Sequence, residues 1–122
     1  MRFARWTFVV AGVWGLLSVT PLYWLEGLIS RERPPAITHP EHFYGFIGVT
    51  MAWQVLFLTI ATDPIRYRPA MPAAVLEKAA FAIAVPILFA MNRVAADSVV
   101  FSSIDGLLGV CFIVSYLRTP RL

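Results

Sequence analysis

The feature that most constrains this chain is a stretch, residues 43–62, that carries no charged side chain. At a rise of about 1.5 Å per residue, a helix of this length crosses the ~30 Å hydrocarbon core of a bilayer. Two histidines, His39 and His42, stand immediately before the stretch, and Asp63 follows it. We therefore predict a membrane-spanning helix whose first turn carries the densest polar cluster of the chain.

Composition extends the membrane prediction to the whole chain. Charged residues make up 14% and hydrophobic residues 59% of the sequence, whereas a soluble globular chain typically carries ~25% charged residues. The arginines stand at the ends of apolar runs, which is typical of membrane segments and not of the basic patch of a nucleic-acid binder. We therefore expect no nucleic-acid partner. The single cysteine excludes an intramolecular disulfide.

Four apolar runs separated by short polar turns predict an all-α fold, a four-helix transmembrane bundle of up-and-down topology. The predicted spans are residues 6–29, 40–62, 72–92 and 98–117. The first run begins like a signal peptide, but its apolar core continues to Leu25 without a small-residue cleavage site, which predicts an uncleaved helix. Residues 1–122 are expected to form a single integral membrane domain.

Basic residues divide unequally between the two predicted membrane surfaces. One surface carries Arg2, Arg5, Arg66, Arg68, Lys78, Arg118 and Arg121, and the other carries Arg31, Arg33 and Arg93. The positive-inside rule then places both termini on the cytoplasmic side, which we take to be that of a bacterial inner membrane. Lys78 lies inside the third run, so we expect its long side chain to carry the amine out to that surface.

Small residues mark the expected packing faces, because they let helix backbones approach closely. At about 100° per residue, the bundle-facing stripes can be read from the spacing. They are Gly12, Gly15 and Glu26 on the first span, Ala73, Glu77, Ala80 and Ala84 on the third, and Ser98, Ser102, Asp105 and Gly109 on the fourth.

The second span carries residues suited to helix–helix contacts on two opposite sides. Its small-residue stripe of Gly45, Gly48 and Ala52 lies nearly opposite Gln54. One side can therefore contact the helix's own bundle while the other contacts a second copy or another subunit. An equally open alternative is that Gln54 simply meets a neighbouring helix of the same bundle.

Asp105 is the most informative single residue. It lies about two turns inside the fourth run, where an ionised carboxylate is costly and is functional by default. It is either a proton-titrating or cation-binding group, or a carboxyl that is kept neutral or is tied to Ser102 and to a residue of a neighbouring helix such as Gln54. Glu26 lies nearer the surface and is either functional or merely interfacial. The candidates for ligand binding or proton titration are Asp105, Glu26, Gln54, His42 and Trp53.

His39 and His42 are the weak candidates for a metal site. Their i, i+3 spacing can bring both rings to one face, with Glu41 and Glu26 nearby. The same segment also reads as an ordinary helix start, with Pro40 at the first helical position. We expect no resident metal and no cofactor.

Three segments, HPEHFYGFIGVTMAWQ, DPIRYRP and LEKAAFAIAV, resemble a group of small bacterial four-span integral membrane proteins of unassigned function. The resemblance covers the second and third spans and their loop, and it implies a four-span fold without an activity. The architecture is also distantly similar to the sterol-isomerase and sigma-2-receptor membrane fold, in which short helices carry inward carboxylates.

The sequence favours a non-catalytic role, because it shows no nucleotide-binding glycine loop, nucleophile elbow or paired-carboxylate hydrolase motif. The leading hypothesis is a small multi-pass membrane protein that binds a lipid-like ligand or acts as an accessory subunit. Its expected partners are membrane lipid and, at the small-residue stripe of the second span, a second copy or another subunit. The alternatives are a proton-coupled transporter using Asp105, or an isomerase-like intramembrane enzyme using Glu26, His42 and Asp105 as acid and base.

Overall fold

The computed structural model describes residues 2–122, and this range contains helices and no strand. The long helices are α1 (Arg2–Val19), α3 (Pro40–Thr62), α4 (Met71–Ala90) and α5 (Ala96–Arg118). The short ones are η1 (Thr20–Trp24), α2 (Glu26–Glu32) and η2 (Arg68–Ala70). Four segments are long and apolar enough to cross a membrane, namely Arg2–Trp24, Pro40–Thr62, Arg68–Ala90 and Ala96–Arg118. The prediction of an all-α, four-helix bundle is confirmed, and these segments indicate a membrane-embedded protein.

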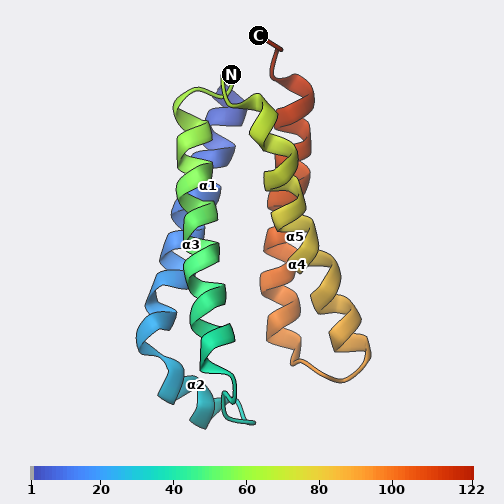
Figure 1. Cartoon of the computed structure of the whole chain (residues 1–122). Coiled ribbons are helices and arrows are strands. Elements are labelled where there is room, and N and C mark those ends of the chain that lie inside the picture. The colour runs from blue at the N-terminus through green and yellow to red at the C-terminus, as the bar shows by residue number, and fades with distance from the viewer. Residues whose placement is uncertain (1) are drawn as a thin grey trace.

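The bundle is built from two helical hairpins (Figure 1). One pairs α1 with α3 and the other pairs α4 with α5, and contacts across the two hairpins are sparser and mainly between α1 and α5. We name the end at which α1 begins and α5 ends the termini end, and the opposite end the α2 end.

The first span differs from the predicted range of residues 6–29. Its α-helix begins at Arg2 and ends at Val19, and a 3₁₀ turn follows before α2 begins at Glu26. Pro21 explains this end, because proline has no backbone N–H to donate and its ring clashes with the preceding helical turn. Glu26 therefore belongs to a separate short helix and does not continue the stripe of Gly12 and Gly15.

The glycine face of α1 packs against α3, as its spacing predicts. A methyl group built on Gly12 would lie 2.7 Å from the Leu58 side chain, and one on Gly15 would collide with the side chain of Gln54. Both glycines are buried. A side chain at either position would force Leu58 or Gln54 to shift, so glycine permits the close approach of these two helices.

The prediction for the packing faces of the second hairpin is half right. On α5, Ser102 and Gly109 are buried as predicted. On α4 the predicted face is wrong, since Ala73, Ala80 and Ala84 are exposed. The buried side chains of α4 are Met71, Ala74, Lys78 and Val85. The helix is rotated so that Lys78 meets α5.

Three phenylalanines join the two hairpins in the half of the bundle nearest the termini. Phe8 of α1 stacks on Phe112 of α5 with ring centroids 4.2 Å apart, and Phe57 of α3 meets Phe112 edge-on at 5.0 Å. All three side chains are fully buried. We name them the phenylalanine core. Toward the α2 end, an ion pair between Arg33 and Asp97 provides a further link between the hairpins.

We expect Phe112→Ala to lower the free energy of unfolding by about 3–5 kcal/mol, because it removes both ring contacts and leaves a cavity between the hairpins. The measurement is denaturant unfolding in detergent micelles. The matched control is Leu117→Ala on the same helix. Leu117 is 71% exposed, so its truncation removes little buried contact. Equal losses for the two variants would contradict the role of the phenylalanine core.

Candidate functional site

Three charged side chains lie together inside the second hairpin. Lys78 of α4 donates a hydrogen bond from Nζ to Oδ1 of Asp105 on α5 at 3.3 Å, and the same Nζ lies 3.7 Å from Oε2 of Glu77. Lys78 and Asp105 stand near the middle of their membrane-spanning segments, Arg68–Ala90 and Ala96–Arg118. We name these three residues the intramembrane charge cluster.

Lys78 is the buried centre of this cluster. Its side chain is 3% exposed, and its Nζ lies 5.3 Å from the centroid of the Phe57 ring. The expectation that Lys78 extends its amine to the membrane surface is therefore wrong. A charge-assisted hydrogen bond to Asp105 and the aromatic face of Phe57 satisfy the amine inside the protein, so it does not need to reach water.

The cluster contains two carboxylates for one amine. Oε2 of Glu77 is buried and has no hydrogen-bond partner among residues 2–122. If all three groups are ionised, the cluster carries one uncompensated negative charge in a setting where charge is costly. Its chemical capacity is therefore to take up one proton or one further cation.

Lys78 is the partner of Asp105 that sequence analysis missed. The partners considered there are occupied elsewhere, since Ser102 donates to the carbonyl of Val99 and Gln54 donates to the carbonyl of Thr50. A signal was available, because Lys78 and Asp105 lie at similar distances along the chain from the turn at residues 91–95. Antiparallel neighbours with matched positions meet at similar depth.

Gln54 and Trp53 are packing residues of α3. The side chain of Gln54 is buried next to Gly15 of α1, and its Oε1 has no hydrogen-bond partner in the described chain. Trp53 is half-buried against the phenylalanine core, with its ring 6.4 Å from that of Phe57. Of the two alternatives for Gln54, the structure shows the contact within its own bundle.

The opposite side of α3 is less covered. Gly45 and Ala52 are exposed, and a methyl group on Gly45 would meet no atom within 4 Å. Gly48 is half-buried, with the Tyr23 hydroxyl 3.4 Å from where its methyl group would lie. The two-sided character of this span is therefore present, with Gly45 and Ala52 directed away from the bundle.

The remaining candidates lie at the α2 end and do not join the charge cluster. Glu26 accepts a hydrogen bond of 2.9 Å from the Tyr44 hydroxyl. Nδ1 of His39 and Nε2 of His42 lie 3.2 Å and 3.6 Å from the same oxygen of Glu41. These three ligand atoms lie within 4.8 Å of one another, and in residues 2–122 this exposed set is the one that could hold a divalent ion.

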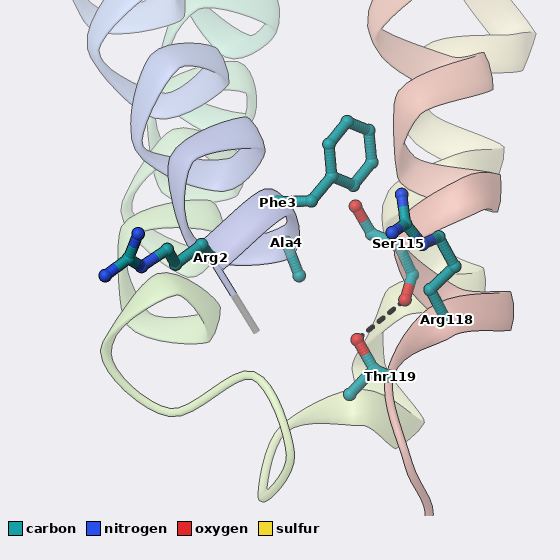
Figure 2. Close-up of a pocket in the computed structure, with 6 residues that line it drawn as sticks. All are labelled: Arg2, Phe3, Ala4, Ser115, Arg118 and Thr119. Atoms are coloured by element: carbon teal, nitrogen blue, oxygen red, sulfur yellow. Dashed lines mark hydrogen bonds between the residues drawn. The ribbon is translucent and has the colours of Figure 1, made fainter.

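A groove opens between the first turn of α1 and the last turn of α5, with a volume of about 450 Å³. Its lining residues are Arg2, Phe3, Ala4, Ser115, Arg118 and Thr119. Figure 2 shows Arg118 turned toward Phe3 on one side and Arg2 extending outward from the other side. We name this feature the α1/α5 groove; no sequence pattern predicted it, because its two sides lie at opposite ends of the chain.

The fold and the charge cluster together describe a small multi-pass membrane protein with an ion pair inside its second hairpin. Comparison of the chain with known family models, curated proteins and solved structures finds no match. The resemblance to small bacterial four-span proteins stays a prediction.

We expect Lys78→Met to cost about 3–5 kcal/mol of unfolding free energy, because it leaves Glu77 and Asp105 without a cation. Asp105→Leu should cost less, since Lys78 keeps Glu77 within 3.7 Å. The double variant Lys78→Met/Asp105→Leu should be more stable than Lys78→Met alone. Unfolding in detergent micelles measures all three, and strictly additive losses would show that the two residues are not coupled.

Proposed function

We propose that this protein is non-catalytic and acts by binding, as an accessory subunit of a membrane assembly or as a holder of a lipid-like ligand. The observation that supports this most is that its candidate acids and bases are paired locally. Asp105 contacts Lys78, Glu26 contacts Tyr44, and His42 contacts Glu41. An enzyme using Glu26, His42 and Asp105 together would need these groups to converge on one cavity.

We propose an inner-membrane location with both termini in the cytoplasm. The support is the distribution of basic residues, which the positive-inside rule converts into an orientation. With Lys78 buried in the bundle, the termini side keeps six arginines of its seven basic residues, against three on the other side. Asp63 is the acidic residue of the termini side.

The binding surface that we propose for a partner helix is the lipid-facing side of α3 at Gly45, Val49 and Ala52. Val49 is 61% exposed, and Gly45 and Ala52 add little bulk on either side of it. In a bilayer, helices associate through close backbone packing, which such a surface permits. Gln54 occupies the other side of α3 inside the bundle, so this side is available without disturbing the fold.

We expect Ala52→Cys, in a Cys111→Ser background, to form an oxidative crosslink between helices in native membranes, because the small face of α3 meets a partner at close range. Gel electrophoresis measures the product, which is a dimer if the partner is a second copy and a heavier mixed adduct if it is another subunit. Adding Gly45→Leu should abolish the crosslink while leaving the monomer folded, since the new side chain would enter open space.

The matched control is Leu107→Cys in the same background. Leu107 is 66% exposed and lies near the middle of the α5 span, at a position comparable with Ala52 in the α3 span. Crosslinking from both positions alike would reveal random collision, and no crosslink from Ala52→Cys would contradict a partner at this face.

The second candidate function is proton-coupled transport, which the charge cluster favours because it carries one acid more than it has bases. This function requires Asp105 to exchange its proton during transport. We expect wild-type protein in vesicles containing a pH-sensitive dye to conduct protons and Asp105→Asn to lose this conduction. An Asp105→Asn variant that conducts protons like the wild type would exclude this candidate.

A further inference from the structure

We propose that the α1/α5 groove is a binding site for an anionic phospholipid, with the lipid phosphate held by Arg118, the positive charge of Arg2 nearby, and the upper acyl region lying on Phe3. This proposal gives a chemical class to the lipid-like ligand and rests on the proposed function only in placing the termini end at a lipid surface. It does not depend on a partner at α3.

The position of the groove matches the level of lipid headgroups. It lies where the apolar segments Arg2–Trp24 and Ala96–Arg118 begin and end, so its floor is at the border between hydrocarbon and water. A volume of about 450 Å³ falls in the ~300–1,000 Å³ range of small-molecule sites. Phospholipid is the ligand that is present at this depth at high local concentration.

The charges of the groove fit a phosphate. None of its lining residues is acidic, and among the ion pairs formed by residues 2–122 none uses Arg2 or Arg118. Guanidinium groups bind phosphate oxygens through paired hydrogen bonds. Arg118 therefore has donors to offer, and it is already held over the groove by the Phe3 ring, 5.5 Å from the ring centroid. Arg2 extends outward from the groove (Figure 2) and adds positive charge at its rim.

The rest of the lining is apolar or already hydrogen-bonded. The Thr119 hydroxyl donates to the carbonyl of Ser115 at 2.6 Å, and the Ser115 hydroxyl donates to the carbonyl of Cys111 at 2.8 Å. These hydroxyl hydrogens are not free for a polar ligand. Together with Phe3 and buried Ala4 they form a surface suited to hydrocarbon, so the groove combines a charged rim with an apolar floor.

This combination distinguishes a phospholipid from free phosphate. Free phosphate would satisfy the arginines but gain nothing from Phe3, and a zwitterionic lipid would bring its own cation next to them. A phosphatidylglycerol carries one net negative charge and acyl chains, so it can use both parts of the groove. Anionic lipids are attracted to basic side chains at a membrane surface, and zwitterionic lipids are attracted less.

The test is retention of lipid by the purified full-length chain, measured by native mass spectrometry after titration with phosphatidylglycerol, phosphatidylcholine or inorganic phosphate. We expect one tightly retained phosphatidylglycerol and weaker retention of phosphatidylcholine. Arg2→Gln/Arg118→Gln should weaken phosphatidylglycerol retention roughly tenfold or more. The matched control, Arg66→Gln/Arg121→Gln, removes the same charge from exposed residues at the same end of the chain but outside the groove.

Phe3→Ala separates the groove from general electrostatic attraction, because it keeps every charge. We expect it to weaken phosphatidylglycerol retention severalfold, with helicity by circular dichroism unchanged. Equal effects of the two double variants, together with no effect of Phe3→Ala, would overturn the proposal. Inorganic phosphate that displaces phosphatidylglycerol at equal concentration would show a soluble anion site and would also overturn it. The α3 crosslink is read independently of all these outcomes.

Discussion

The Lys78–Asp105 ion pair determines how the second hairpin is assembled. In a lipid environment an unpaired charge at mid-span is costly, so the pair must face its partner helix and not lipid. Turning Lys78 toward α5 brings Ala74 and Val85 inward with it and leaves the alanines of the other face exposed. This close approach of the two helices is possible because Gly109 has no side chain. A Cβ atom built on Gly109 would lie 3.2 Å from the Cβ of Lys78. One electrostatic contact thus fixes the rotation of α4.

The two hairpins are joined by a different kind of contact. The phenylalanine core is apolar and lies toward the termini end, and it reaches the charge cluster through Phe57, whose ring faces the Lys78 amine. Phe57 therefore belongs to both features, as a buried ring of the core and as the aromatic face above the lysine. A change in the charge of the cluster would act first on the packing of this ring, and through Phe57 on the contact between the hairpins. Elsewhere the hairpins meet more sparsely, so their relative position depends on few residues.

Much of the fold was predictable because hydrophobic length is a strong constraint in a bilayer. The charge-free run at residues 43–62 predicts the helix that the structure shows as α3, and the spacing of Gly12 and Gly15 predicts the packing face of α1. The length of the first apolar run alone does not predict the end of α1 at Val19, because Pro21 interrupts the α-helix inside that run. The small residues of α4 do not predict its packing face, for a physical reason. Small residues only allow close packing, whereas a charged side chain inside the membrane must have a partner, so the pairing of Lys78 with Asp105 decides which face is buried. The α1/α5 groove joins opposite ends of the chain, and no local pattern predicts such a contact.

The distribution of charge separates two tasks within one small protein. The acidic groups of the interior, Glu77 and Asp105, are held against Lys78 inside the second hairpin, where they contribute to assembly. The arginines are gathered mainly at the termini end, where Asp63 is their acidic counterpart and where the α1/α5 groove opens. Because the interior acids lie against Lys78 while the arginines of the termini end face a single acidic residue, the positive potential of the protein is strongest at one membrane surface. A phosphate-bearing lipid at that surface would complete the charge balance that the chain itself leaves open.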